Sequence, residues 1–504
     1  MSLARIYSRA QVGIQAPEVI VEVHLGNGLP AFHIVGLPEA SVKEAKDRVR
    51  SALENSKFGF PDQRITVNLA PADLPKEGGR FDLAIAVGIL IASEQIVCTD
   101  IERYEFYGEL ALNGEVRGVN AILPSVLAAK AQGRCCFLPL VNDSLASLVN
   151  GVERKAVSSI QEVWSDLLNQ QPLPLNISYP EQQHSGVEFL IDLSDVKGQP
   201  GAKRVLEIAA AGGHNLLFLG PPGTGKSMLA QRMPTIMPGM SDDEALSTAA
   251  LYSIIGQSVD LTNWRKRPFR NPHHTCSAVA LVGGSSNPKP GEISLAHNGV
   301  LFLDELPEFE RKVLDSLREP METGTVTISR AARQMEFPAQ FQLIAALNPS
   351  PTGCHNDKRA TPDQVMRYLS RVSGPFIDRI DLQIELPRLN SAQLQSTQEE
   401  QSSATVRTRV EAAYNLQLRR QGKVNARLNN KEMSVHCALA APELQFLAKA
   451  SEKLSLSPRS YHRVIKVART ISDLKGQDNI SLDELKEALN YRAFERLLSQ
   501  LTQY

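Results

Sequence analysis

A glycine-rich loop between an apolar strand and a helix constrains this chain more than any other feature. The loop lies between the apolar run at 215–219 and the helical run at 228–232, and it consists of Gly220-Pro221-Pro222-Gly223-Thr224-Gly225-Lys226-Ser227. It fits the pattern GxxxxGK[ST] in the strand–loop–helix context that the pattern requires. Backbone N–H groups and the helix N-terminus favour phosphate oxygens there, which predicts binding of ATP. In that arrangement Lys226 reaches the β- and γ-phosphates, and the Ser227 hydroxyl coordinates Mg²⁺.

Two strand-like runs of the same block, 299–303 and 342–347, end in polar side chains. The first run ends in Asp304 and Glu305, and the second in Asn348. Asp304 suits Mg²⁺ held through water, Glu305 suits polarising the water that attacks the γ-phosphate, and Asn348 can orient that water. In a chain without the glycine-rich loop, Asp304 and Glu305 would be explained as a solvated strand end. Asn348 would be explained as a turn-forming residue before a proline.

Two arginines later in the chain are candidates for stabilising the transition state. Arg379 lies between two aspartates, and in a ring of subunits such an arginine can reach a neighbour's nucleotide. Arg459 follows Ser457 and Pro458, which predict a helix cap and first turn, and from there it can reach the γ-phosphate. For either arginine alone a surface salt bridge is the commoner explanation. The pattern leaves open whether Arg371 rather than Arg379 acts across subunits.

Two stretches without sustained periodicity divide the chain of 504 residues, a length that suits about three domains. One stretch is rich in Pro and Gln, and the other, at 389–404, is rich in Gln, Ser and Glu. We expect an α/β protein with a domain at 1–170, a linker at 171–188, a parallel-sheet core at 189–388 and a helical region at 389–504.

Short patterns predict individual elements within these blocks. Residues 19–25 and 64–69 are strand-like, and residues 41–53 have helical spacing with one apolar face. Ser481, followed three residues later by Glu484, forms a capping box that predicts the start of a helix.

Composition narrows the compartment and the partners. The chain has 54 Lys and Arg against 55 Asp and Glu, which excludes a uniformly basic coat but allows a local basic channel. No apolar run reaches the roughly 18–20 residues of a membrane helix, and the N-terminus lacks a secretory pattern. The six cysteines form no CxxC pair. A cytoplasmic protein without membrane contact is therefore expected.

Cations gather in three segments that are candidates for contacting DNA. Residues 405–427 hold six Lys and Arg against one acid, although a solvated helical face explains that run most simply. The segment 265–274 includes Arg270, His273 and His274, and its cations can instead pair with acids of a neighbouring subunit. Arg330 and Arg333 lie at the tip of an expected hairpin, where cations repeated round a pore can follow a phosphate backbone. Adjacent histidines face different ways, so we interpret His273 and His274 as packing or pore contacts rather than metal ligands.

Together these motifs resemble the magnesium-chelatase-like AAA+ ATPases, and the ComM/YifB family along nearly the whole chain. The closer resemblance rests on six further stretches, which lie at 269–275 (Phe269-Arg270-Asn271-Pro272-His273-His274-Thr275), 281–284, 290–297, 35–38, 67–78 and 461–463. It implies a homohexameric, ATP-driven helicase that migrates DNA branches and joins incoming single-stranded DNA to the chromosome in natural transformation. The sequence leaves open whether loading needs a partner such as a recombinase. The resemblance also implies that Asn348 is sensor 1, Arg379 the arginine finger and Arg459 sensor 2. Residues 323–342 match the hairpin before sensor 1, and a helix-2 insert is expected at about 270–298.

The first block resembles the Lon-protease-like fold (ribosomal S5 domain 2-like), and the last block resembles the helical lid of this clade. Arg80 stands where active proteases carry the serine nucleophile, and the catalytic lysine would fall near Leu123. Peptidase chemistry is therefore not expected. Many family members carry a zinc-binding cysteine cluster after sensor 1. Here those places hold Ser350, Thr352, Lys358 and Ala360, so we expect no zinc.

Two other functions share the same nucleotide site. A chelatase-type motor would power a partner that inserts metal into a tetrapyrrole, and a protein remodeller would use the first block as an adaptor. Tetrapyrrole chelatase motors lack that first block, which favours the DNA motor.

Overall fold

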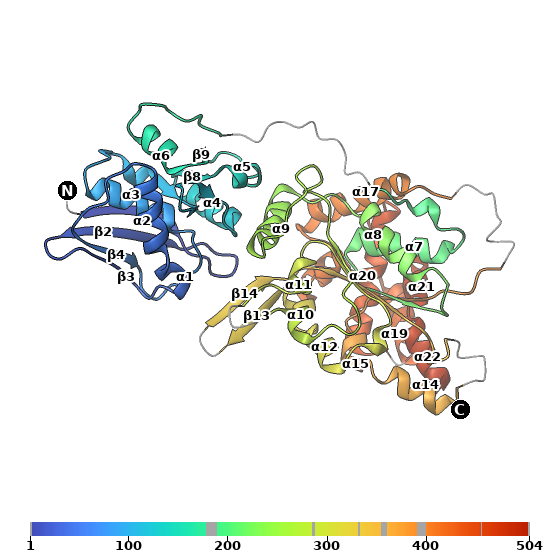
Figure 1. Ribbon diagram of the computed structural model, residues 1–504. Coiled ribbons are helices and arrows are strands. Elements are labelled where there is room, and N and C mark those ends of the chain that lie inside the picture. Colours follow the sequence, from blue (N-terminus) through green and yellow to red (C-terminus); the bar gives the residue numbers. More distant parts are fainter. Residues whose placement is uncertain are drawn as a thin grey trace. The chain divides into compact units, whose positions relative to one another are not determined.

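The computed structural model describes residues 3–177, 189–284, 288–330, 333–353, 360–390, 400–454 and 456–501. They form two units of mixed α/β structure (Figure 1). The first unit holds the described residues of Met1–Gly186, Asp242–Trp264 and Ser329–Phe337, and the second those of Val187–Ser241, Arg265–Ile328 and Pro338–Tyr504. Within the described residues, none of the helices has the length and apolar character needed to cross a membrane.

A seven-stranded mixed sheet forms the core of the first unit. Its spatial order is β3 (Ala31–Val35), β4 (Arg64–Ala70), β2 (Glu18–Gly26), β1 (Leu3–Arg9), β5 (Tyr104–Phe106), β8 (Cys135–Pro139) and β9 (Arg154–Val157). Strand β2 runs antiparallel to β1 and β4, and the other neighbours are parallel. The strands predicted at 19–25 and 64–69 are confirmed as β2 and β4. A separate short pair consists of β6 (Glu109–Leu110) and β7 (Val116–Arg117).

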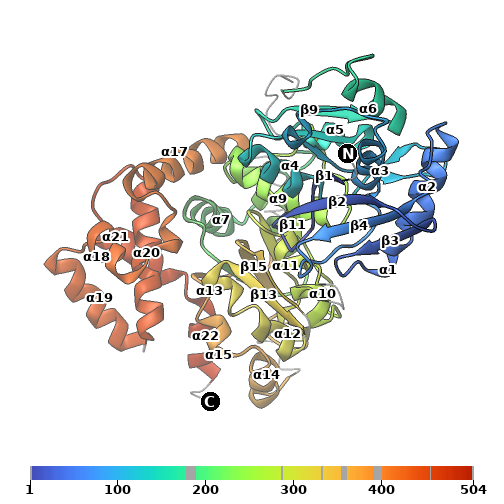
Figure 2. The ribbon, with the colours of Figure 1, turned by 90° about the vertical axis from the view of Figure 1, so that its left-hand side faces the viewer.

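Helices cover the sheet of the first unit. Helix α3 (Asp82–Ala92) is buried almost throughout and packs on β1 and β2 (Figure 2). The helix predicted at 41–53 is interrupted at Glu44, and its predicted apolar face is buried at Val42, Ala45, Val49 and Leu53. The other helical elements are α1 (Ala40–Lys43), α2 (Ala45–Asn55), a 3₁₀ turn (Ile101–Arg103), α4 (Ile122–Ala131), α5 (Leu140–Ala146) and α6 (Ile160–Leu167).

Two segments from the middle of the chain belong to the first unit. Helix α9 (Asp242–Ile254) buries Ala249 and Ala250 against the apolar cluster of α4, and the Ala121 N–H donates to the Ser253 carbonyl at 2.8 Å. The second segment, Ser329–Phe337, is the outer part of the predicted hairpin, whose arms are β13 (Thr325–Arg330) and β14 (Arg333–Pro338). The boundaries predicted from the sequence instead include both segments in the parallel-sheet core at 189–388. The order of segments along the chain does not show on which sheet each segment packs.

A five-stranded parallel sheet, as predicted, forms the centre of the second unit. Its order is β11 (Phe269–Arg270), β12 (Val300–Leu303), β15 (Gln342–Leu347), β10 (Leu216–Leu219) and β16 (Leu382–Glu385). Leu216 pairs in register with Ile344 on one side and Leu382 on the other. Because all neighbours are parallel, every strand ends at the same edge of the sheet.

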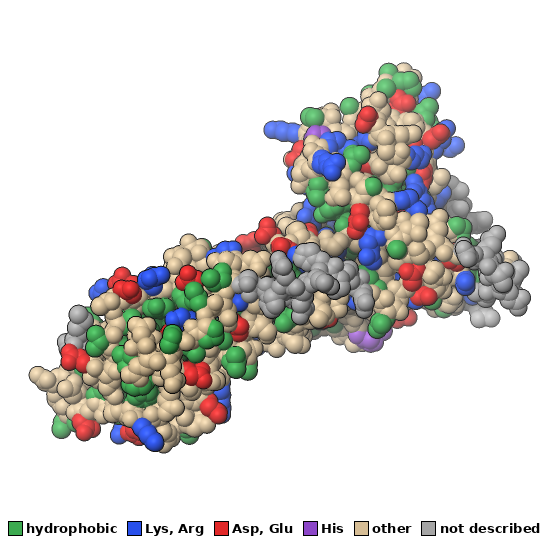
Figure 3. Space-filling model, turned by 90° about the horizontal axis from the view of Figure 1, so that it is seen from above, with side chains coloured by type: hydrophobic (Ala, Val, Ile, Leu, Met, Phe, Trp, Pro, Cys, Tyr) green, Lys and Arg blue, Asp and Glu red, His purple; other side chains and the backbone are tan. Residues whose placement is uncertain are grey.

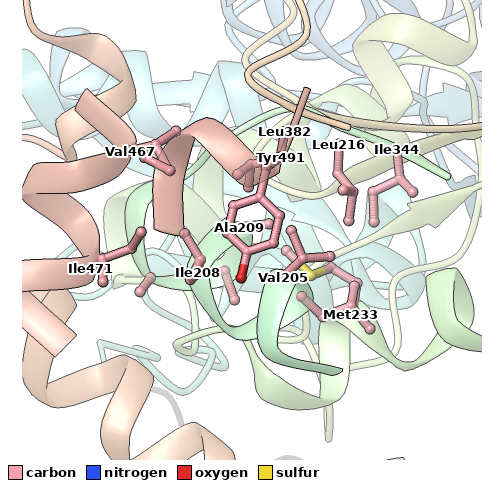
Figure 4. Close-up of a cluster of buried hydrophobic side chains, with 14 of the residues drawn as sticks. Val205, Ile208, Ala209, Leu216, Met233, Ile344, Leu382, Val467, Ile471 and Tyr491 are labelled. Atoms are coloured by element: carbon pink, nitrogen blue, oxygen red, sulfur yellow. The ribbon is translucent and has the colours of Figure 1, made fainter. Parts of the chain in front are cut away.

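Helices pack on this sheet and bury a continuous apolar core. Figure 4 shows that α7 (Pro200–Gly212) supplies Val205, Ile208 and Ala209, which lie among side chains of the sheet, of α8 (Lys226–Ile236) and of the C-terminal region. Burial of such side chains contributes roughly 25 cal/mol per Å² of apolar surface, so this core fixes the strands that carry the candidate site.

The C-terminal region is helical, as its patterns predict. Ser457 caps α20 (Pro458–Leu474) by accepting from the Ser460 N–H, and Ser481 and Glu484 form the capping box of α21 (Leu482–Asn490). The other helices there are α17 (Ser403–Gln421), α18 (Asn430–His436), α19 (Ala441–Leu454) and α22 (Ala493–Leu501). The short elements of the second unit are α10 (Ala278–Val282), α11 (Glu292–Leu295), α12 (Arg311–Ser316), α13 (Pro320–Thr323), α14 (Pro362–Leu369), α15 (Gly374–Ile377) and three 3₁₀ turns (Leu193–Asp195, Leu306–Glu308, Asn425–Arg427).

Candidate active site

The polar side chains predicted from the sequence converge at the carboxyl edge of the parallel sheet. The loop 220–227 follows β10, Asp304 and Glu305 follow β12, and Asn348 follows β15. These three strands are neighbours in the order β12, β15, β10. Ligands of open α/β sheets bind outside the carboxyl ends of the strands, so this edge is the natural place for a nucleotide.

The backbone of the loop requires glycine at two positions. Gly223 and Gly225 have φ angles of 78° and 90°, a conformation that side-chain-bearing residues rarely adopt. The Thr224 hydroxyl donates to the Pro221 carbonyl at 2.9 Å, and this hydrogen bond stabilises the loop. The loop then leads directly into α8, whose N-terminus carries the partial positive charge that attracts phosphate.

Lys226 is buried and surrounded by neutral oxygens. Its Nζ donates to the carbonyls of the first two loop residues at 2.6 and 2.9 Å and to Asn348 Oδ1 at 3.0 Å. Burial lowers the pKa of Lys226, and the charges of Asp304 and Glu305 oppose that change. Carbonyl and amide oxygens do not neutralise an ammonium group, so Lys226 is available to pair with phosphate oxygens.

Ser227 and Asp304 form a pair of oxygen ligands beside the lysine. Ser227 Oγ donates to Asp304 Oδ2 at 2.6 Å, and the Glu305 N–H donates to Asp304 Oδ1 at 2.9 Å. Hydroxyl and carboxylate oxygens are the ligands that Mg²⁺ prefers. The pair therefore fits a magnesium ion bound together with a nucleotide.

Glu305 has an unusual backbone and a neighbour that the sequence did not predict. Its φ angle is 52°, in the left-handed region that non-glycine residues seldom occupy and that often marks functional sites. His274 Nδ1 lies 3.4 Å from Glu305 Oε2. His274 follows β11, the strand beside β12, so strand order is the signal that would have brought the two residues together.

Arg379 and Arg459 lie at the opposite, amino edge of the sheet. Arg379 precedes β16, and the N–H of Asp381 donates to the carbonyl of Asn215, just before β10. Strand β10 spans about 13 Å between that edge and the phosphate loop. Both arginines approach one carboxylate oxygen of Glu322, Arg379 at 2.6 Å and Arg459 at 3.9 Å. Arg459 therefore lies beside Arg379, and its contact with a γ-phosphate stays a prediction.

Arg371 lies nearer to this chain's own candidate site. Its Nη1 is 3.2 Å from Glu308 Oε2 and also donates to the Pro307 carbonyl at 3.5 Å, both in the turn that follows Glu305. Arg371 is half exposed, whereas Arg379 is buried and donates to the carbonyls of Arg318 and Pro375. The two arginines that the sequence could not distinguish thus occupy different edges.

Most candidate DNA-contacting cations that the structure describes have partners within the second unit. Arg270 forms a two-bond ion pair with Glu292 at 2.6 and 2.7 Å. Within the run 405–427, Arg409, Arg420 and Lys423 pair with acids, and Arg407 and Arg427 donate to neutral oxygens. Figure 3 shows Lys and Arg interspersed with Asp and Glu on the drawn face. These intramolecular partners favour the interpretation of that run as a helical face, and its contact with DNA stays untested.

Two other predictions, the DNA contact of the hairpin arginines and the absence of a zinc site, concern residues at or beyond the limits of description. The side chains of Arg330 and Arg333 lie outside the described residues, so their contact with DNA stays a prediction. Ser350 and Thr352 share a hydrogen bond of 3.0 Å, while Cys354, His355 and Lys358 fall outside the described part. Among residues that are described, no three His, Cys, Asp or Glu side chains gather as a metal site would require.

The place expected for a protease nucleophile holds a buried cation. Arg80 Nη2 donates to Ser125 Oγ at 2.8 Å, and burial lowers the pKa of Arg80 to about 10. Leu123 is fully buried and apolar. An arginine hydrogen-bonded to a serine offers no base that would activate the hydroxyl, so the pair lacks the chemistry of a serine–lysine dyad.

Comparisons with known proteins agree along the whole chain. Residues 192–394 match the family described as magnesium chelatase subunit ChlI, residues 21–142 match subunit ChlI of Mg-chelatase, and residues 400–492 match its C-terminal part. The competence protein ComM of Haemophilus influenzae is 54% identical over 100% of both chains. The YifB proteins of Salmonella typhimurium and Escherichia coli are 49% identical over 99% of each chain, and both are named as uncharacterized.

Proposed function

The chain belongs to the ComM/YifB family of magnesium-chelatase-like AAA+ proteins, and from that premise we propose that it is an ATP-driven motor that migrates branches in DNA. Family membership indicates ATPase activity. The relative named as a competence protein supports a role in natural transformation, in which the motor would join single-stranded DNA to the chromosome. The work would take place in the cytoplasm, with a recombinase as a loading partner.

One observation carries the ATPase proposal: the convergence of Lys226, Asp304, Glu305 and Asn348 at one edge of the sheet. Mg²⁺, when bound with ATP at Ser227 and Asp304, neutralises phosphate charge. Lys226 exchanges its carbonyl partners for phosphate oxygens. Glu305 accepts a proton from the water that attacks the γ-phosphorus, the bond to the β-phosphate oxygen breaks, and ADP leaves. Asn348 orients that water.

The separation of the two edges supports a ring of subunits. Arg379 and Arg459 meet Glu322 at the amino edge, whereas their own chain's phosphate loop lies at the carboxyl edge, so their charge would act at a site on another copy. We propose a homohexamer in which each arginine edge faces the carboxyl edge of a neighbour.

For the first unit we propose a Lon-protease-like fold that has no peptidase activity. The mixed sheet and the buried Arg80–Ser125 pair support this assignment. Its role would be to organise the ring, to bind DNA, or both, while the C-terminal helices act as the lid of the motor.

DNA stimulation of ATP hydrolysis tests the proposal. We expect forked or single-stranded DNA to raise the turnover number, and we expect binding that weakens steeply with salt because phosphate contacts release counterions.

Lys226→Ala should abolish both hydrolysis and strand movement. Arg330→Ala with Arg333→Ala should spare basal hydrolysis and weaken DNA engagement, with the exposed residues Lys449 and Lys453 of α19, both changed to Ala, as the matched control.

The alternative is a chelatase-type or protein-remodelling motor acting on a protein partner. No stimulation by any DNA, together with no salt-sensitive DNA binding, would overturn the DNA motor and favour that alternative. Equal unwinding by the double hairpin variant would move the DNA contact elsewhere in the chain.

A further inference from the structure

A cavity of about 310 Å³ lies in the first unit, between the loop at 72–75 and the outer part of the hairpin. The nucleotide site uses neither element. Ligand sites measure roughly 300–1,000 Å³, so this cavity suits one small group. Its two polar side chains, Asp73 and Gln334, are exposed, so they lie where the cavity opens to solvent. Its walls are apolar and include Val12, Leu37, Leu74 and Met335.

One wall is fixed because the hairpin packs closely on a tight turn of the first unit. Val12 and Gln15 exchange two main-chain hydrogen bonds of 2.9 and 3.0 Å across this turn. A Cβ atom on Gly13 would lie 3.4 Å from the Glu336 carbonyl oxygen and 3.9 Å from the Met335 Cβ, so β14 lies directly against the turn. Met335 is buried, and its position in the wall therefore does not depend on a ligand.

Another wall is formed by Leu37, which is held in an exposed position. Leu37 is 75% exposed, and its φ angle of 55° lies in the left-handed region that often marks functional sites. Lys76 is fully buried and donates to the carbonyls of Gly36 and Pro71, so it joins the loop of Leu37 to the loop at 72–75. A buried ammonium group is costly to desolvate. The chain thus maintains a costly arrangement that presents an apolar side chain to solvent.

A nucleobase matches this combination of apolar walls and polar groups at the opening. Its two faces are apolar, and its edge carries hydrogen-bond donors and acceptors. Apolar side chains such as leucine insert between stacked bases and hold them apart. An apolar side chain from a second copy of the chain would fill the walls but would use neither Asp73 nor Gln334. Gln334 directly follows Arg333, one of the hairpin arginines proposed to contact DNA, so the cavity borders that proposed contact.

We propose that this cavity is a base pocket, which holds one unstacked base of single-stranded DNA with Leu37 against its face and Asp73 at its edge. This inference rests on the function proposed above and gives the DNA a subsite. A carboxylate accepts hydrogen bonds, so Asp73 favours a base with an exocyclic amino group. Cytosine presents that group, whereas thymine presents a carbonyl oxygen in its place, which the carboxylate repels. The base pocket keeps a separated strand from pairing again during branch migration.

Two oligonucleotides of the same length, oligo-dC and oligo-dT, test the edge contact on the full chain with a slowly hydrolysed ATP analogue. Their phosphates are identical, so the ratio of their Kd values reports on the bases. Wild type should bind oligo-dC about three- to tenfold more tightly, the size expected for one hydrogen bond. Asp73→Ala should bring the ratio close to that of equal binding. Asp62→Ala, at an exposed aspartate of the same unit, is the matched control and should keep the ratio of wild type.

Leu37→Ala tests the contact with the face of the base. Because Leu37 is exposed, its truncation should leave folding unchanged, and it should weaken binding of both oligonucleotides about fivefold through lost apolar contact. A 2-aminopurine base within the oligonucleotide fluoresces more strongly when it is unstacked. Its fluorescence should rise on binding to wild type and rise less on binding to Leu37→Ala. Leu29→Ala is the matched control, since Leu29 is 88% exposed in the same unit and does not line the cavity.

The outcomes separate the base pocket from the DNA motor. Equal Kd values of wild type for the two oligonucleotides, with binding that still weakens with salt, would overturn the base pocket and leave the motor in place. A preference for oligo-dC that persists in Asp73→Ala would overturn it too. A loss of ring assembly in Leu37→Ala, with unchanged DNA binding, would show that the cavity receives a second copy instead of a base. If wild type binds no DNA, both proposals are wrong.

Discussion

The two edges of the parallel sheet in the second unit satisfy their polar side chains in different ways. At the carboxyl edge, Lys226 is held by neutral oxygens and Glu305 is half exposed. At the amino edge, Asp381 is buried, accepts from the Asn215 N–H at 3.0 Å and pairs with Arg463, which holds its pKa well below the usual range. Neutral partners can be exchanged for a phosphate or a water, whereas a buried network of opposite charges is costly to open.

One carboxylate at the amino edge does not belong to a buried network of charges. Glu322 is half exposed and holds both Arg379 and Arg459. These arginines therefore have a partner that another anion can replace. The phosphate loop thus lies at one edge of the sheet, and two arginines that share an exchangeable partner lie at the other, which is the arrangement that the proposed ring would use.

Arg379→Ala tests this comparison with the largest expected effect. Loss of an arginine that acts across subunits should lower ATP turnover by about 10³-fold or more while ATP binding remains. Turnover number and nucleotide affinity should be measured in the same preparation. Arg371→Ala is the matched control, since Arg371 lies near its own chain's site and pairs with Glu308. A large loss in the Arg371 variant and none in the Arg379 variant would break the comparison.

A mixture of two inactive variants tests whether Arg379 acts within its own subunit or on a neighbouring one. A subunit with Arg379→Ala keeps its own Glu305, and a subunit with Glu305→Gln keeps its own arginine. If the arginine acts on a neighbour, mixed rings contain some complete sites, and turnover should recover to a measurable fraction of wild type. If both groups act within one chain, no mixture recovers activity.

Glu305→Gln probes the carboxyl edge alone. The amide cannot accept the proton of the attacking water, so hydrolysis should fall by about 10²-fold or more while ATP still binds. Because Lys226, Ser227 and Asp304 remain, the variant should assemble with ATP and stay assembled. Normal turnover would show that another group takes the proton.

The pH dependence of the free energy of unfolding tests the burial of His297 at the amino edge. Burial, with a further contribution from Arg427, lowers the pKa of His297 to about 4, and its Nδ1 accepts from the Gln340 N–H at 3.0 Å. The unfolded chain, with a histidine pKa of about 6.5, binds more protons between these values, so stability is lost as the pH falls through that window. Between pH 7.5 and 5.0 the free energy of unfolding should fall by about 2 kcal/mol from this group.

The measurement compares urea unfolding of wild type and His297→Gln at both pH values. Glutamine keeps an oxygen acceptor for the Gln340 N–H but does not titrate over this range. The variant should lose about 2 kcal/mol less on acidification than wild type. Equal losses would mean that other groups govern acid stability.

The sequence predicts the carboxyl edge well because its signals are local. A strand that runs into a glycine-rich loop, or that ends in two carboxylates, shows both the residue and its place, and β10, β12 and β15 lie where the patterns predict them. The capping residues Ser457 and Ser481 are local signals too, and both are confirmed.

Features that depend on non-local packing could not be predicted in the same way. Nothing within the segment 376–381 shows that Arg379 lies at the opposite edge from the loop, because that follows from strand register. The contact of His274 with Glu305 depends on strand order. The charge of the run at 405–427 does not by itself show which acids pair with it, because partners such as Glu207 and Asp473 lie in other helices.

Glu322→Gln has the smallest expected effect and bears on the one exchangeable group of the amino edge. Glutamine still accepts a hydrogen bond from Arg379 but carries no charge to compete with a neighbour's phosphate. Ion pairs at exposed sites contribute about 0–1 kcal/mol, so ATP turnover should rise by no more than about two- to threefold. Glu319→Gln, an exposed acid in the same segment, is the control and should leave the rate unchanged. A tenfold loss in Glu322→Gln would instead mean that Glu322 holds Arg379 in its working position, and the amino edge would then be preorganised rather than waiting for an anion.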